Sequence, residues 1–217
     1  MAVRSDKLRD KMDLGDLDHV RRAAVLISTG SGHGSGFFIS EQGHILTNAH
    51  VVGNADLVRV VTAGRQYKLI AGVIRKDKER DVALLRIEEM PEDFKPVVLP
   101  IRADIPRIGE EVYAIGSPLS EEDLQDTVTK GIVSAWRPSD RITRQSYIQA
   151  DVTVQPGNSG GPFLDGHGNI LGLTVAGFTD SAGSTAGLNL FIPIGEALRK
   201  LDIGSTGEPV DLKPTRK

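Results

Sequence analysis

The stretch Gln155-Pro156-Gly157-Asn158-Ser159-Gly160-Gly161-Pro162 is the part of the sequence around which the rest can be placed. It follows one apolar run, Tyr147–Val152, and precedes another, Ile170–Val175. Glycine adopts backbone angles closed to other residues and lets a ligand approach the main chain, so this turn can aim several N–H groups and the Ser159 hydroxyl at one point. Acyl transfer requires such a nucleophile beside hydrogen-bond donors. A plain glycine-rich hairpin loop would have a similar sequence, so this stretch alone leaves both interpretations open.

The composition indicates many short strands joined by turns. The chain has 217 residues, enough for one large domain or two small ones with a proper core. Its 24 glycines exceed the usual share of roughly 7%, and 39% of its residues are apolar. We therefore expect an all-β fold, as in a barrel or a sandwich.

Composition also narrows the classes of function. With a net charge of −3 and no long basic run, nothing points to nucleic acid. No apolar run approaches the roughly 18 residues of a membrane span, and the charged stretch Met1–Asp18 does not resemble a signal peptide. The absence of cysteine excludes disulfides, zinc–thiolate sites and a cysteine nucleophile, and the histidines have no metal-ligand spacing. We expect no metal and no cofactor, and the compartment stays open: periplasmic or secreted if a signal peptide was removed, cytoplasmic otherwise.

The pattern along the chain predicts three regions. Residues 1–18 form a polar arm, 19–203 the folded domain and 204–217 a polar tail. Asp16 is expected to cap a short helix with an apolar face of Leu17, Val20 and Ala24. Thr29–Gly36 is predicted to be a loop because it holds four glycines.

Apolar runs separated by turn signals predict the strands. They are Ala23–Ser28, Phe37–Ile39, His44–Thr47, Leu57–Thr62, Gln66–Ile74, Val82–Ile87, Val112–Ile115, Thr127–Trp136, Tyr147–Val152, Pro162–Leu164, Ile170–Val175 and Leu188–Ile192. One helix is predicted at the end, over Ile194–Leu201, where apolar residues recur at helical spacing after Pro193.

Two polar residues at the borders of predicted strands are candidate partners of Ser159. His50 follows the strand His44–Thr47 at a point where the chain must turn, which suits a residue that faces a cleft. Asp81 directly precedes the strand Val82–Ile87, and a carboxylate at such a border needs a partner because burying an unpaired charge is costly. A histidine N–H would be suitable. His50, Asp81 and Ser159 stand in the chain order of the chymotrypsin triad.

Around these residues the sequence resembles the trypsin-like serine proteases, specifically their HtrA (Deg) branch. The resembling segments are Gly34–Ile39, Thr47–Val52, Asp81–Leu85, Ala114–Pro118, Gly131–Ala135 and Gly157–Pro162. The resemblance implies two six-stranded barrels, roughly over 19–105 and 106–203, with the site in the cleft between them. It also implies a serine endopeptidase that hydrolyses polypeptides, mostly unfolded or damaged ones, through an acyl-enzyme.

The resemblance further assigns roles to individual residues. His50 would act as general base and then acid, and Asp81 would fix its tautomer and stabilise the imidazolium. The backbone of Gly157, Asn158 and Ser159 would form the oxyanion hole, with the N–H groups of the first and last as donors.

A lipase-type Gly-x-Ser-x-Gly elbow also matches Gly157–Gly161, but the elbow requires a helix directly after the serine and a histidine downstream. Gly160-Gly161-Pro162 begins a helix poorly, and the only later histidine, His167, lies in a predicted turn. The elbow is therefore excluded.

The resemblance locates the substrate pocket only roughly. Trypsin carries its acidic pocket residue six positions before the nucleophile, where this chain has Thr153, so a strong preference for Arg or Lys is not expected. Asn189 stands where HtrA relatives often have glycine, which would narrow or polarise the pocket. The expected pocket residues are Thr153, Thr174, Val175, Ala176, Leu188, Asn189 and Leu190.

The sequence also departs from the HtrA pattern. Only 16 residues follow Leu201, too few for the PDZ domain that HtrA proteins usually carry there. HtrA trimers are usually held by aromatic residues near the N-terminus, and the first aromatic here is Phe37, so a homo-oligomer is left open. The loops 119–126 and 138–146 are candidates for ordering the site. A chaperone-like binder of unfolded polypeptide with little cleavage remains an alternative, although a binder needs no complete triad.

Overall fold

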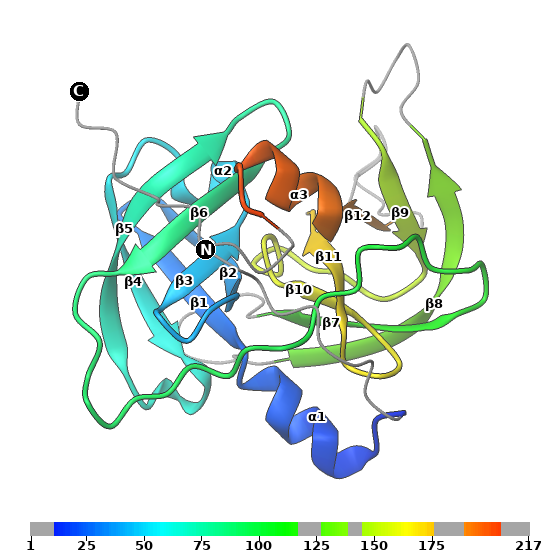
Figure 1. Ribbon diagram of the computed structural model, residues 1–217, viewed down its shortest axis with the longest axis horizontal. Coiled ribbons are helices and arrows are strands. Elements are labelled where there is room, and N and C mark those ends of the chain that lie inside the picture. The colour runs from blue at the N-terminus through cyan, green and yellow to red at the C-terminus, as the bar shows by residue number, and fades with distance from the viewer. Residues whose placement is uncertain (1–10, 117–126, 139–144, 176–188, 205–217) are drawn as a thin grey trace.

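The first half of the described chain pairs into a closed barrel of antiparallel strands. The computed structural model describes residues 11–116, 127–138, 145–175 and 189–204. The neighbours in the barrel follow the order β1-β2-β3-β6-β5-β4 (Figure 1). These strands are β1 (Ala24–Thr29), β2 (Gly32–Phe38), β3 (His44–Thr47), β4 (Leu57–Thr62), β5 (Lys68–Asp77) and β6 (Val82–Ile87).

A second closed barrel follows, with the order β10-β11-β12-β9-β8-β7. Its strands are β7 (Glu111–Gly116), β8 (Thr127–Arg137), β9 (Tyr147–Ala150), β10 (Pro162–Asp165), β11 (Ile170–Thr174) and β12 (Asn189–Pro193). A short helix, α3 (Ile194–Lys200), comes after β12. The expected all-β class, a double six-stranded barrel with a short C-terminal helix, is confirmed.

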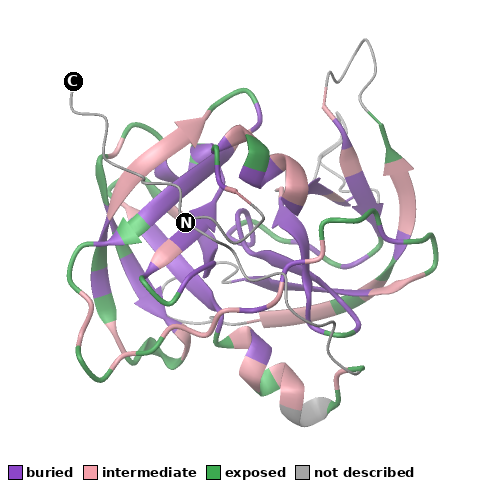
Figure 2. Ribbon diagram, in the orientation of Figure 1, coloured by how far each residue is buried: buried purple, intermediate pink, exposed green. Residues whose placement is uncertain are grey.

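Alternation along the strands divides the core into barrel interiors and a seam between the barrels. On β6, Val82 and Leu84 pack in the seam, whereas Ala83 and Leu85 pack inside the first barrel. Successive side chains of a strand point to opposite faces, and here both faces are covered over Val82–Leu85, so these four residues are all apolar and buried (Figure 2). Each such Leu or Val contributes roughly 1.5–3 kcal/mol by burial. β7 divides its residues in the same way.

Helix α3 lies between the two barrels (Figure 1). Its apolar side, with Ile194, Ala197 and Leu198, joins the core of the seam. Where the helix ends, Arg75 of the first barrel donates from Nη1 to the Leu201 carbonyl at 2.7 Å. The C-terminal helix therefore holds the second barrel against the first. No helix in the described ranges is long and apolar enough to cross a membrane.

The N-terminal helix begins earlier than expected and crosses the expected boundary at residue 18. Helix α1 spans Leu14–Arg21, and Asp13 caps it, in place of Asp16. Asp13 Oδ1 accepts from the Asp16 N–H at 2.9 Å, and Asp16 Oδ2 accepts from the Asp13 N–H at 3.1 Å. This reciprocal pair satisfies two N–H groups at the helix start. Ala24 belongs to β1 and not to the helix. The rest of the arm, residues 1–10, and the tail, 205–217, lie outside the described residues.

The glycine-rich segment after β1 is largely a strand, so the predicted loop was wrong. Residues 32–36 belong to β2 and pair with β1. A Cβ on Gly36 would lie 2.6 Å from Ile27 Cδ1 and 2.8 Å from the Leu46 carbonyl oxygen. Glycine is needed here because the neighbouring strands approach too closely for a side chain. Composition alone cannot distinguish such a glycine-rich strand from a glycine-rich loop.

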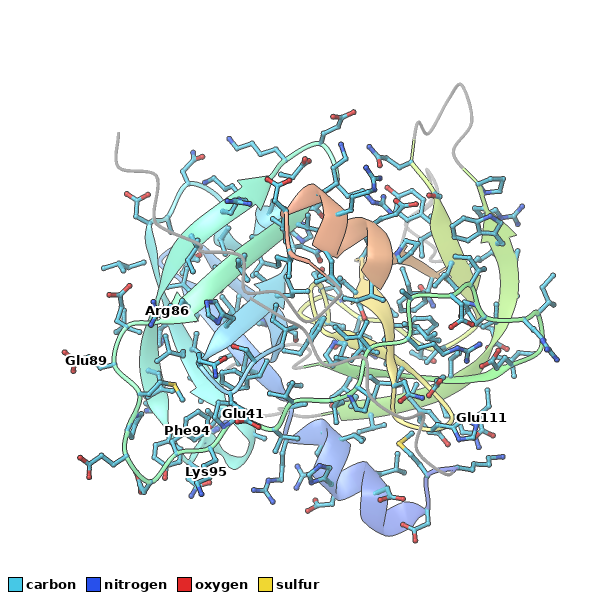
Figure 3. The ribbon with its side chains drawn as sticks, viewed as in Figure 1. Glu41, Arg86, Glu89, Phe94, Lys95 and Glu111 are labelled. Carbon is cyan, nitrogen blue, oxygen red and sulfur yellow. The ribbon has the colours of Figure 1, made fainter. Side chains whose placement is uncertain are left out.

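The segment after β6 closes one end of the first barrel. The ring of Phe94 lies 4.8 Å from that of Tyr67 and 5.7 Å from that of Phe38. Figure 3 shows Phe94 and Lys95 together at this end. A small pocket opens beside them, and none of its lining residues belongs to the candidate site.

Candidate active site

The pairing of β3 with β6 brings His50 next to Asp81. Thr47 lies opposite Ala83 in the antiparallel register, so the residues after Thr47 pass those before Ala83. The chain then forms a one-turn helix, α2 (Ala49–Val52), where only a turn was expected. The side chain of His50 stays about half exposed (49%), while its neighbours in α2 are buried. The buried neighbours therefore hold the backbone of His50 in place, while its imidazole side chain remains partly exposed to solvent.

Two contacts join His50 to the Asp81 carboxylate. The His50 backbone N–H donates to Oδ1 at 2.9 Å, and Nδ1 lies 2.7 Å from Oδ2. The Asp81 backbone is left-handed, with φ of +63°, and Asn48 Nδ2 donates to its carbonyl oxygen at 2.9 Å. A left-handed aspartate persists where its surroundings hold it, often at functional sites. Both carboxylate oxygens are thus committed to His50.

This geometry also sets the protonation of His50. The hydrogen bond to Asp81 raises the pKa of His50 above its ordinary value of 6.5, although partial burial opposes the rise. An ionised carboxylate only accepts hydrogen bonds, so Nδ1 carries the proton in the neutral imidazole and Nε2 is the basic nitrogen. His50 can therefore act as a general base through Nε2.

The turn before Ser159 has the conformation that its sequence favours. The Asn158 N–H donates to the Gln155 carbonyl at 3.0 Å, and Gly157, the third residue of this turn, has φ of +97°. A positive φ at that position defines a type II turn, for which Pro at the second and Gly at the third position are preferred. Pro156-Gly157 meets both preferences. The turn fixes the direction of the peptide N–H between these two residues.

The same turn decides which N–H groups are available to a ligand. Among the described residues, the N–H groups of Gly157 and Ser159 donate to no backbone carbonyl. The Asn158 N–H is already bonded to Gln155, so this residue of the expected oxyanion hole contributes to the turn and not as a donor. Asn158 shapes the turn, and its side chain lies close to Gly116, where a Cβ would be 2.7 Å from Oδ1.

The Ser159 turn packs directly against the strands that lead to His50. Gly160 has φ of +82°, and a Cβ there would lie 2.3 Å from both the Ser35 carbonyl oxygen and Thr47 Oγ1, and 2.9 Å from the Asn48 nitrogen. Ser35 bonds the turn twice, donating from its N–H to the Ser159 carbonyl at 2.8 Å and from Oγ to the Gly157 carbonyl at 2.7 Å. The two barrels thus place the Ser159 turn beside the residues that precede His50.

The expected pocket residues are only partly described. Ala176 and Leu188 lie outside the described residues, as do the loop 119–126 and residues 139–144. Asn189 is buried and donates from Nδ2 to the Val152 carbonyl at 2.6 Å, while its Oδ1 has no hydrogen-bond partner among the described residues. Thr174 is likewise buried, and within the same ranges its Oγ1 has no partner. Of the others, Thr153 is exposed and Val175 and Leu190 are half-buried. The described pocket candidates thus combine two buried polar side chains, Thr174 and Asn189, with two half-buried apolar ones, Val175 and Leu190.

Comparison with known proteins agrees with this arrangement. Residues 34–173 match the model of the trypsin-like peptidase domain. The chain belongs to the trypsin-like peptidase family. The chloroplastic Protease Do-like 1 of Arabidopsis thaliana is 39% identical over 168 residues, which are 75% of this chain and 37% of that protein. A probable periplasmic serine endoprotease, DegP-like, of Pseudomonas putida (strain GB-1) is 42% identical over 166 residues, 76% of this chain and 33% of that protein.

Solved structures of HtrA-type proteases resemble this trypsin-like domain throughout. The HtrA-type protease AlgW with decapeptide has a TM-score of 0.73 and 26% identity over 88% of this chain and 67% of that chain. The same protease with tripeptide has a TM-score of 0.72 and 32% identity over 84% and 61%. The resemblance to HtrA-type proteases is confirmed. The trypsin-like domain spans about a third of the length of the curated relatives named above.

Sequence reasoning missed several residues that support the site of this trypsin-like domain. Ser35 lies within the segment Gly34–Ile39 that carried the resemblance, and Asn48 directly precedes α2, but neither was given a role. Arg80 was not given a role either, although it is 1% exposed. Its position next to Asp81 was the only available signal. Among the described residues, no group of three or more His, Cys, Asp or Glu side chains is placed to hold a metal ion.

Proposed function

We propose that the chain is a serine endopeptidase in which Ser159 is the nucleophile, His50 the general base and Asp81 the carboxylate that orients His50. The observation that carries this proposal is the paired contact of Asp81 with His50, which makes Nε2 the basic nitrogen. The type II turn before Ser159 supports it independently, because two N–H groups there are without a backbone partner among the described residues.

The reaction follows from these atoms. His50 Nε2 takes the proton of Ser159 Oγ as that oxygen attacks the carbonyl carbon of a peptide bond. The oxyanion accepts hydrogen bonds from the N–H groups of Gly157 and Ser159. When the C–N bond breaks, the imidazolium gives its proton to the leaving amine and an acyl-enzyme remains. Water, deprotonated by the same nitrogen, then releases the acid and restores Ser159.

The two contacts to Asp81 contribute by orientation and charge. They keep Nδ1–H directed at the carboxylate and stabilise the imidazolium that forms in each half-reaction. The hydrogen bond from the His50 backbone to Oδ1 prevents the carboxylate from rotating away. For the chymotrypsin fold, replacing this carboxylate by an amide costs about 10⁴ in kcat through the wrong tautomer.

Unfolded polypeptide is the substrate class that we propose. An extended segment can present its backbone to a cleft between two barrels, and the curated relatives include DegP-like endoproteases. The second candidate is a chaperone-like binder of the same segments with low or loop-regulated cleavage. The serine distinguishes the two, because a binder would keep its function without the Ser159 hydroxyl.

Cleavage of denatured casein tests the proposal. We expect fragments with the wild-type chain and none above background with Ser159→Ala, which removes one oxygen from a buried site and leaves the turn intact. Equal melting temperatures of the two chains would confirm that the comparison concerns chemistry. Activity of Ser159→Ala within about tenfold of wild type would refute the assignment, since the hydroxyl alone does the covalent step.

A further inference from the structure

Arg80, the residue before Asp81, has a fully buried side chain although it carries a charge. Its Nη2 donates to the Ser146 carbonyl at 2.5 Å, and its Nε lies 2.9 Å from Glu196 Oε2. The guanidinium carbon lies 4.7 Å from the centre of the Tyr147 ring. Ser146 Oγ also hydrogen-bonds Glu196, so the three partners of Arg80 form one connected group.

All three partners come from the second barrel or its helix. Ser146 directly precedes β9, Tyr147 is its first residue, and Glu196 lies on α3. The turn between β5 and β6, by contrast, belongs to the first barrel. Arg80 therefore ties the turn that carries Asp81 to elements that also position the half of the molecule containing Ser159.

The contacts of Arg80 are poorly arranged for stability alone. Within the part of the chain that the structure describes, Nη1 is buried without a hydrogen-bond partner, and Nε, although within ion-pair distance of Glu196, makes no aligned hydrogen bond. Replacing a buried ion pair by apolar residues of similar volume is often neutral or stabilising. A buried polar group that is left unsatisfied calls for another explanation. The adjacent residue, Asp81, is the one whose left-handed backbone the surroundings must hold.

We propose that Arg80 is a positioning residue: by fixing the β5–β6 turn against Ser146, Tyr147 and Glu196, it holds Asp81 in the conformation that directs both carboxylate oxygens at His50. The inference rests on the proposed function for its kinetic consequence, but the geometry of the His50–Asp81 pair can be measured without turnover. When the contacts of Arg80 are lost, the left-handed Asp81 backbone relaxes and the carboxylate moves out of hydrogen-bond distance of His50.

The test uses a double variant, Arg80→Met with Glu196→Leu, which removes both charges and so leaves none buried unpaired. We expect the melting temperature of this double variant to stay near that of the wild type. On an extended peptide, kcat should fall by about 10²-fold, because misplacing a catalytic group by about 1 Å can cost that much. KM should change by less than about threefold. Measured by NMR, the His50 pKa should fall toward 6.5 in the double variant. Arg102→Met is the matched control, because Arg102 is also largely buried among acidic partners, Asp104, Glu110 and Asp165, none of them in the site.

The outcomes separate the two hypotheses. A wild-type chain without turnover refutes the proposed function, and the His50 pKa then still tests Arg80. A folded double variant with wild-type kcat and an unchanged His50 pKa overturns the positioning role. So does an equal loss of kcat in Arg102→Met, which would indicate a general effect of stability. If the double variant does not fold, Arg80→Lys decides: it keeps the charge but lacks the planar guanidinium fork that bonds Ser146 and Glu196 from two different nitrogens. We then expect kcat to fall about tenfold, and an unchanged kcat overturns the proposal.

Discussion

His44 and His50, six residues apart, have pKa values shifted in opposite directions. Burial, with Arg86 nearby, lowers the pKa of His44 to about 4, and Nδ1 of His44 lies 2.7 Å from Ser40 Oγ. The hydrogen bond to Asp81 raises the pKa of His50 instead. Both imidazoles are partly buried, so the neighbouring charge decides the difference: the Arg86 cation disfavours the imidazolium of His44, whereas the Asp81 carboxylate favours that of His50. Of these two histidines, His50 is therefore the one suited to exchange a proton near neutral pH.

An NMR titration of the histidine rings should show this difference. We expect His50 to titrate above pH 6.5 and His44 near pH 4, with Asp81→Asn returning the pKa of His50 toward 6.5.

Activity and stability should depend on pH through the same two histidines. Because the base must be neutral, kcat should fall as the pH drops through the raised pKa of His50. His44 should lower stability as the pH falls from about 6.5 to about 4, where only the unfolded chain takes up the proton. His50 has the opposite sign: its stabilisation is complete below 6.5 and is lost as the pH rises through the folded pKa. A wild-type His50 that titrates below 6.5 would contradict the account.

Sequence reasoning identified the residues of the candidate site that stand at strand borders. His50 and Asp81 follow or precede apolar runs, and such borders are visible in one dimension. Ser35 and Arg80 were missed because their partners lie far along the chain: Ser35 contacts Gly157, 122 residues away, and Arg80 contacts Ser146, 66 residues away. The closure of the barrels decides which distant segments come into contact, and no local sequence pattern indicates these contacts.

At the scale of elements, glycine was the residue that sequence patterns predicted least well. The runs Leu57–Thr62 and Val82–Ile87 were predicted with their observed bounds, because β-branched and apolar residues without glycine give an unambiguous strand signal. β2 was cut short at its glycines, and α2 is a single turn with too few residues to show helical spacing. A glycine in a strand differs from one in a loop only because a neighbouring strand lies beside it, and the local sequence does not show which segment that is.

Gly160 and Gly64 form a matched pair for testing how tightly the Ser159 turn is held. Both have positive φ, +82° and +66°, but a Cβ on Gly160 meets atoms at 2.3 Å, whereas a Cβ on Gly64 meets nothing within 4 Å. Gly64→Ala should cost about 1–2 kcal/mol through its backbone angle alone. Gly160→Ala adds a steric cost of about 1–3 kcal/mol and should be the more destabilising by that amount. Urea unfolding gives both values, and equal losses would contradict the close packing of the turn on Ser35 and Thr47.

At the scale of the whole molecule, the two barrels create the site at their seam. The six strands of each barrel could be expected once the resemblance was recognised. The core of the seam could not, because the residues of one strand divide between the seam and the barrel interior. The seam brings α3 of the second half against β5 of the first. In the proposed function, a substrate would therefore contact groups from both barrels.

The pocket predicts where the chain cuts its substrates. None of the expected pocket residues carries a charge, so a buried Arg or Lys would lack a counter-charge and lose several kcal/mol. A small or medium aliphatic side chain gains roughly 0.8 kcal/mol per buried methylene. Cuts should therefore follow Val, Ile, Leu or Ala, and we expect Thr174 Oγ1 and Asn189 Oδ1, which have no hydrogen-bond partner among the described residues, to influence the choice among them. Mass spectrometry of casein fragments locates the cuts. Cuts mainly after Arg or Lys that are absent with Ser159→Ala would contradict this interpretation of the pocket.

The central claim is that Ser159 is a nucleophile activated by His50, and covalent labelling by a fluorophosphonate tests it most directly. The probe phosphonylates an activated serine hydroxyl, fluoride leaves and the proton passes to the base. We expect a single adduct, located on Ser159 by tandem mass spectrometry, that is absent in Ser159→Ala and forms at least about 10²-fold more slowly in His50→Ala. No adduct on a folded wild-type chain, or equal labelling rates in wild type and His50→Ala, would contradict it.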